Sequence, residues 1–248
     1  MINFEYKNNT MKKQLLVFLL FFCLFQTNCS KSNNSSVSNG NSNQNLATSP
    51  SAKAPYDNSN YGIYKGVFIG SSGVIILDIS NGNDSLTATL IIDGVAHHFI
   101  SDQPIQQNEN TTITFEDGND NFTFIVSSNG SNPTITNLNI NGHPNAAILV
   151  VKETSTTLVK CYEGTFSGDF SGVLNALIYG SVIKGMSRAY GETSIVTWGG
   201  MQSNNQLNNV RASNGGTCSG TINGNNINGN WVRDSDHKSG TCTAVRTY

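Results

Sequence analysis

The stretch TTITFEDGNDNFTFIV, Thr111–Val126, decides the fold class. Two runs of β-branched and aromatic residues flank a polar turn that contains the pair Asp117-Gly118. Asp-Gly pairs tolerate the positive φ angles that tight hairpin turns require. The stretch therefore predicts an antiparallel hairpin with strands over 111–115 and 122–126.

The same pattern recurs along the chain from Tyr61 onward. Short runs rich in Ile, Val, Thr, Phe and Tyr alternate with turn residues at a spacing of roughly 8–15 residues. Further Asn-Gly or Asp-Gly pairs lie at 81–82, 93–94, 129–130, 141–142, 223–224 and 228–229. No helical periodicity persists between the glycines. We therefore expect an all-β protein made of antiparallel meanders, as small barrels or sandwiches, with almost no helix after the N-terminal apolar run.

An internal echo divides this region in two. The heptapeptide Tyr64–Gly70, YKGVFIG, reappears as Tyr162–Gly168, YEGTFSG, at an offset of 98 residues. The echo predicts two tandem units, residues 61–157 and 158–248, with about eight strands each.

The composition excludes one class of partner. Charged residues are 12% of the 248-residue chain, about half the usual share. The chain has 14 Lys and Arg residues and 16 Asp and Glu residues. The resulting net charge of -2 provides no basic field for nucleic acid. We therefore expect no nucleic-acid partner.

Residues 1–60 have a different character. Met11-Lys12-Lys13 precedes the apolar run Leu15–Phe25, which is too short for a spanning helix and is typical of a signal peptide. Met11 is accordingly the expected translation start. The Ser- and Asn-rich segment from residue 29 to residue 60 lacks apolar periodicity and predicts a flexible tether.

The five residues after the apolar run, Gln26–Ser30 (QTNCS), resemble the cleavage site of bacterial lipoproteins. The resemblance implies that residues 1–28 are removed as a signal peptide and that Cys29 is acylated. It also implies a lipid anchor in the outer membrane of a two-membrane bacterium, with the folded part facing the periplasm or the surface. Cleavage by ordinary signal peptidase, which leaves a soluble secreted protein, is the alternative.

The second unit carries a further resemblance. Gly164-Thr165-Phe166 and the glycine-punctuated strands that follow it resemble the opening of an avidin-like or lipocalin-like barrel. The final strands, which include Gly229-Asn230-Trp231, are similar in style to these barrels and to those of transferrin-binding surface lipoproteins. The resemblance implies a barrel fold, and no biotin-binding residue is transferred.

Three cysteines follow Cys29, namely Cys161, Cys218 and Cys242, and an oxidising compartment predicts one disulfide among them. If Cys218 and Cys242 lie on the first and third strands of the last meander, their backbones are about 10 Å apart, too far for a disulfide. Barrel closure would instead make the strands of Cys161 and Cys242 neighbours. The sequence therefore favours a Cys161–Cys242 disulfide, with three reduced thiols as the alternative.

Motifs of catalysis and metal binding are missing from the sequence. It contains no nucleophile elbow and no His-Glu-x-x-His motif, and its histidines lack the paired spacing of a metal site. The acidic run Asp117–Asn121 is explained by a hairpin turn without calcium. We expect no enzymatic activity, no catalytic residue, no cofactor and no metal.

Four aromatic residues are the candidate ligand-binding residues: Trp198, Trp231, Tyr179 and Tyr190. Tyr and Trp combine apolar area with a polar group and serve either pockets or cores. The favoured function is a non-enzymatic cell-envelope lipoprotein that binds a small apolar or glycan-like ligand or a protein partner. The alternatives are a structural component of an outer-membrane assembly and, less favoured, a hydrolase assembled from dispersed residues.

Overall fold

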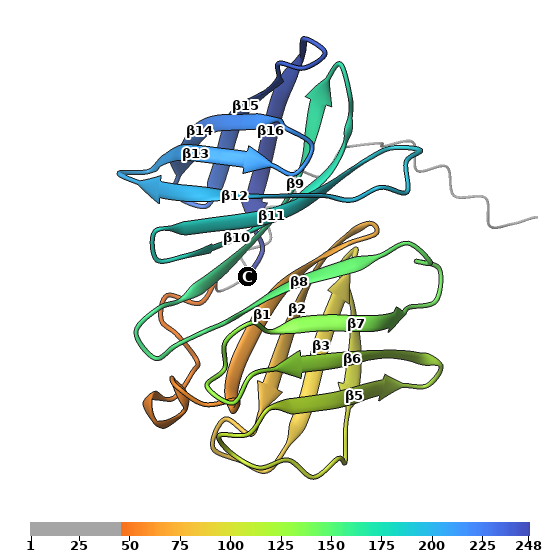
Figure 1. Ribbon diagram of the computed structural model, residues 1–248, viewed down its shortest axis with the longest axis vertical. Helices are drawn as coiled ribbons and strands as arrows, with labels where there is room; N and C mark the ends of the chain where they lie inside the picture. Colours follow the sequence, from red (N-terminus) through yellow and green to blue (C-terminus); the bar gives the residue numbers. More distant parts are fainter. Residues whose placement is uncertain (1–45) are drawn as a thin grey trace, which may run out of the picture. The chain divides into compact units, whose positions relative to one another are not determined.

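The computed structural model describes residues 46–248, which form antiparallel strands almost throughout (Figure 1). The all-β prediction is confirmed. Within this range the one helix is the 3₁₀ turn η1 (Ala54–Tyr56), and no helix is long and apolar enough to cross a bilayer. Met11, the predicted signal peptide and Cys29 lie outside the described residues.

The first unit is an eight-stranded sheet. Its strands are β1 (Gly62–Ile69), β2 (Ser72–Ile79), β3 (Leu86–Ile92), β4 (Val95–Ile100), β5 (Thr111–Asp117), β6 (Asp120–Val126), β7 (Thr134–Asn139) and β8 (Ala147–Lys152). They follow one another as a meander from β1 to β7, and β8 returns to pair with β1. The edge strands β7 and β8 approach each other, so the sheet forms a nearly closed barrel.

The predicted hairpin at 111–126 is formed by β5 and β6. Its register runs from Thr111 opposite Val126 to Asp117 opposite Asp120, and Gly118 in the turn has a φ of 61°. The interior of this unit is filled by large side chains. Five fully buried phenylalanines contribute to it: Phe68, Phe99, Phe115, Phe122 and Phe124.

The second unit is a closed eight-stranded barrel. Its strands are β9 (Val159–Gly168), β10 (Gly172–Tyr179), β11 (Val182–Ala189), β12 (Val196–Ser203), β13 (Gln206–Ala212), β14 (Thr217–Asn223), β15 (Asn226–Arg233) and β16 (Lys238–Arg246). Each strand pairs with the next, and β16 pairs with β9 to close the ring. The expectation of two eight-stranded units is therefore confirmed.

The outer faces of β9 and β10 pack against β1 and β2. Val67 and Ile69 from the first unit share an apolar cluster with Cys161 and Leu177 from the second. The buried Asn175 side chain donates a 2.6 Å hydrogen bond from Nδ2 to the carbonyl oxygen of Phe68. The two units are thus joined by apolar packing and by the buried hydrogen bond between Asn175 and Phe68.

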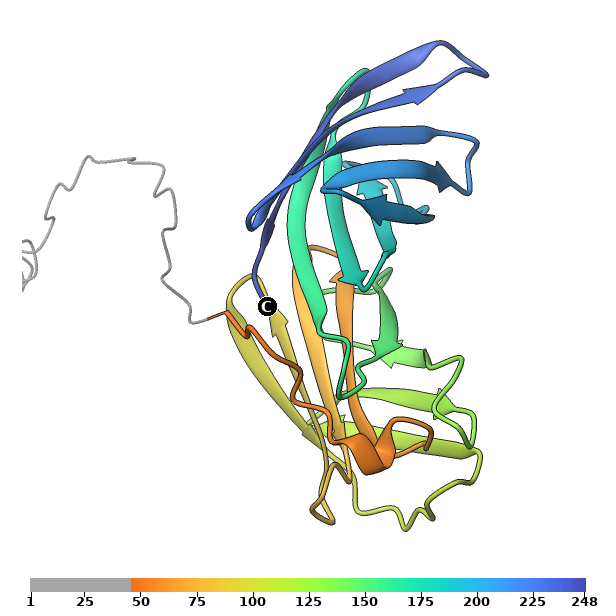
Figure 2. The ribbon, with the colours of Figure 1, turned by 90° about the vertical axis from the view of Figure 1, so that its left-hand side faces the viewer.

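Residues 46–60 correct the predicted length of the tether, because this part is built into the fold. Figure 2 shows the segment running beside strands of the first sheet. The Ser51 amide donates to Glu153 at 2.7 Å, and the buried Asn60 side chain donates to Thr111 at 2.6 Å. Composition alone indicated a flexible coil, because it does not show the hydrogen-bond partners of this segment, which lie far away in the sequence.

Candidate ligand-binding cavity

The closed barrel encloses a cavity of about 700 Å³. Every one of its eight strands contributes at least one lining residue, because alternate side chains along each strand point inward. The remaining lining residues come from the connections β9–β10, β11–β12 and β13–β14, which lie at one end of the barrel. The cavity therefore has an open end formed by these loops.

Glycines at inward positions of the barrel leave room for the side chains of neighbouring strands. Gly185 on β11 faces Trp198 on β12, and a Cβ at Gly185 would collide with the indole ring. Gly229 on β15 provides similar space between the side chains of Cys218 and Cys242. Glycine at these positions thus accommodates the Trp198 ring and the two thiols against the barrel wall.

Both tryptophans of the chain line the cavity. The ring of Trp198 packs against Gly185, and its Nε1–H is buried without a hydrogen-bond partner among the described residues. Trp231 pairs with Gly240, and its Nε1–H donates to the carbonyl oxygen of Ser167 at 3.1 Å. The two indoles therefore form apolar walls of the same space.

The open end of the cavity carries an aromatic cluster. The ring centroid of Trp231 lies 6.2 Å from that of Phe166 and 6.3 Å from that of Phe170. The guanidinium carbon of Arg233 lies 4.9 Å from the Phe170 ring centroid, and the same side chain forms a 2.6 Å ion pair with Asp236. This hydrogen-bonded guanidinium holds the pKa of the Asp236 carboxyl below its usual value.

Among residues 46–248, charged side chains reach the cavity only near its open end. The three that line it are Asp169, Glu192 and Arg233, while the deeper lining includes Leu174, Ile183, Leu207, Val210 and Ile227. An apolar interior with polar groups at the rim is typical of sites that bind small apolar molecules.

The structure brings together three of the four predicted aromatic residues. Trp198, Trp231 and Tyr190 line the cavity, and Tyr190 is 66% exposed at the open end. Tyr179 lies on the outer face of β10, where it packs against the apolar cluster between the two units. The sequence analysis did not identify Phe166 and Phe170 as site residues. Tyr162 on β9 is buried in the interior cluster of the barrel, and Phe166, four residues further along, lies on the same face of the strand. The two-residue alternation of a strand, counted from Tyr162, could therefore have placed Phe166 inside.

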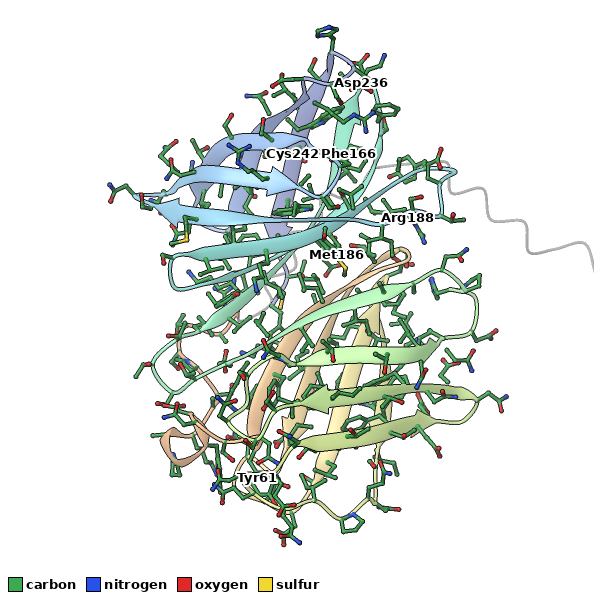
Figure 3. All side chains as sticks on the ribbon, in the orientation of Figure 1. Tyr61, Phe166, Met186, Arg188, Asp236 and Cys242 are labelled. Carbon is green, nitrogen blue, oxygen red and sulfur yellow. The ribbon has the colours of Figure 1, made fainter. Side chains whose placement is uncertain are left out.

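The predicted Cys161–Cys242 disulfide is wrong. Strands β9 and β16 are neighbours as expected, but the residue opposite Cys242 is Phe166 (Figure 3). Cys161 points out of the barrel, with its Sγ 3.7 Å from the carbonyl oxygen of Gly66, whereas Cys242 points into the cavity. Within residues 46–248 all three cysteines are free thiols.

Comparison with known proteins gives no relative: no family model, no curated protein and no solved structure matches this chain. The protein is therefore described by its fold and its cavity. The chain contains a closed antiparallel barrel with a mostly apolar interior space that opens at one end.

Proposed function

We propose that this protein is a non-enzymatic cell-envelope lipoprotein whose C-terminal barrel binds a small apolar ligand. The observation that carries the proposal is the cavity of about 700 Å³, which lies in the range of roughly 300–1,000 Å³ typical of ligand sites. Membrane attachment through acylated Cys29 is part of the proposal and is supported by the sequence resemblance.

The lining favours an apolar ligand over a glycan. Glycans are bound through many hydrogen bonds to hydroxyl groups, whereas the deep part of this cavity presents mainly aliphatic and indole surface. The ligand would place its apolar body against Trp198 and Trp231 and its polar end near the charged rim. Burial of the apolar body provides the main driving force for binding.

Tryptophan fluorescence is a direct test, since the only two tryptophans both line the cavity. An environment-sensitive apolar dye, 8-anilinonaphthalene sulfonate, is titrated into the folded protein while tryptophan emission is recorded. We expect saturable binding at one dye per chain with quenching of tryptophan emission. Displacement of the dye by long-chain fatty acids or other apolar molecules then ranks the ligand classes.

A matched pair of variants locates the binding. Ala212 lines the cavity, and Arg211, its neighbour on β13, is exposed on the outside of the barrel. Ala212→Phe fills cavity space and should weaken dye binding at least about tenfold, because it removes apolar contact worth more than about 1.4 kcal/mol. Arg211→Phe should leave the affinity unchanged. Equal affinities in the two variants would refute binding inside the barrel.

A further inference from the structure

Cys218 and Cys242 meet inside the barrel above a glycine. Cys218 lies on β14 and Cys242 on β16, and their Sγ atoms are 3.7 Å apart. Gly229 on the intervening strand β15 leaves room for both sulfurs. A Cβ at this residue would lie 3.1 Å from the Cys242 sulfur and 3.4 Å from the Cys218 sulfur.

The strand register keeps the backbones of the two cysteines too far apart for a disulfide. Cys218 pairs with Trp231 and Cys242 pairs with Gly229, so the cysteines are two strands apart and offset along them. Two strand spacings alone amount to about 9–10 Å, whereas a disulfide needs Cα atoms within about 7 Å. Because the barrel wall is curved, inward side chains approach one another more closely than their backbones do. The geometry therefore favours two adjacent thiols over a disulfide.

The distance between the sulfurs fits a single bridging ion. Zinc–sulfur bonds of about 2.3 Å at a tetrahedral angle place two sulfurs about 3.8 Å apart, close to the 3.7 Å observed. Thiolates select soft metal ions over hard ones. We propose that Cys218 and Cys242 bind one soft d¹⁰ metal ion, of the Zn²⁺ or Cd²⁺ kind, on the wall of the cavity.

The surroundings of the thiols define what the protein supplies to this ion. Among residues 46–248 no group of three or more His, Cys, Asp and Glu side chains is placed to hold a metal. The described part of the chain therefore provides two ligands, and the other coordination positions face the cavity, where water or a small molecule can fill them. An ion held in this way would add a polar anchor to a mostly apolar space.

Cadmium provides a spectroscopic test. Cd²⁺ is titrated into the reduced full-length protein in a buffer without chelators, and the thiolate-to-cadmium charge-transfer absorbance is recorded in the ultraviolet. We expect the signal to saturate at one ion per chain and Zn²⁺ to compete with it. Cys218→Ser and Cys242→Ser should each weaken binding at least about tenfold, because each removes a direct ligand.

The third cysteine provides the matched control. Cys161 is buried on the outer face of the barrel wall, so Cys161→Ser should leave the cadmium signal unchanged. A signal that depends on Cys161, or that persists in both other serine variants, would overturn the proposal. So would a Cys218–Cys242 disulfide, found by alkylation in denaturant without reductant and peptide mapping.

This inference does not rest on the apolar ligand proposed above. The dye titration reports on the cavity, and the cadmium titration reports on the two thiols. Cadmium binding without dye binding would sustain the metal site and refute the apolar ligand. Serine variants that still bind the dye demonstrate an intact barrel, so their loss of cadmium would support the direct role of the thiols.

Discussion

Removing the carboxylate of Glu153 tests whether the junction of the two units depends on a buried ion pair. Glu153 and Lys65 have fully buried side chains, and the Lys65 ammonium lies 2.5 Å from Glu153 Oε2. The same oxygen accepts a 3.0 Å hydrogen bond from the buried Val159 amide, and Oε1 accepts one from the Ser51 amide. One carboxylate thus connects the N-terminal segment, β1 and the start of β9.

The expected loss of stability follows from the groups that Glu153→Ala would leave without partners. An ammonium whose buried partner is removed destabilises the fold by about 3–5 kcal/mol. The buried Val159 amide adds about 1–3 kcal/mol, while the Ser51 amide lies at an exposed residue that water can reach. The lower ends of these ranges already give about 4 kcal/mol, a large part of the roughly 5–15 kcal/mol by which a domain is stable.

Urea denaturation followed by circular dichroism and tryptophan emission measures this loss. Lys65→Met combined with Glu153→Leu removes both charges and should be much less destabilising than Glu153→Ala, because no buried charge is left alone. Asp236→Ala breaks an exposed ion pair and should cause no measurable change. A Glu153→Ala protein with the same denaturation midpoint as Asp236→Ala would refute the reasoning.

Three further predictions concern single side chains. Gly185→Val should push the Trp198 ring away from β11 and destabilise the barrel by about 1–3 kcal/mol through overpacking; an unchanged emission maximum and denaturation midpoint would contradict this. Burial raises the pKa of the Cys161 thiol to about 12, so a maleimide at pH 8 should label Cys161 only after unfolding, and equal native and denatured labelling rates would disprove it. Burial lowers the pKa of Lys152 from 10.5 to about 8, so the unfolded chain binds more protons than the folded one between these values. Stability relative to Lys152→Met should therefore rise with pH across that window, and a constant difference in urea titrations at pH 8, 9 and 10 would count against it.

The sequence predicted the strands well because their signals are local. The hairpin of β5 and β6 needed only two β-rich runs and an Asp-Gly turn within 16 residues. The structure forms this hairpin, with strands that extend beyond the predicted ends to Asp117 and Asp120. The echo between Tyr64–Gly70 and Tyr162–Gly168 likewise predicted two units of eight strands. Composition failed for residues 46–60, whose hydrogen-bond partners come from strands far along the chain.

The candidate site was predicted only in part. A side chain lines the cavity only if it points into the barrel, and residue type alone does not give that direction. Trp198 and Trp231 were identified from their chemistry, and Tyr179 was chosen on the same grounds although it faces out of the barrel. The disulfide prediction failed for the same reason. Neighbouring strands were inferred correctly, but Cys161 and Cys242 point to opposite sides of the wall.

By itself, then, the sequence determined the all-β class and the two units, since these depend on local propensity and repetition. Only the tertiary structure decided that the second barrel is hollow and that Cys218 meets Cys242 above Gly229. The physical reason is that closure of the sheet fixes the register of all eight strands together. That register determines which side chains share the interior, and no single strand contains this information.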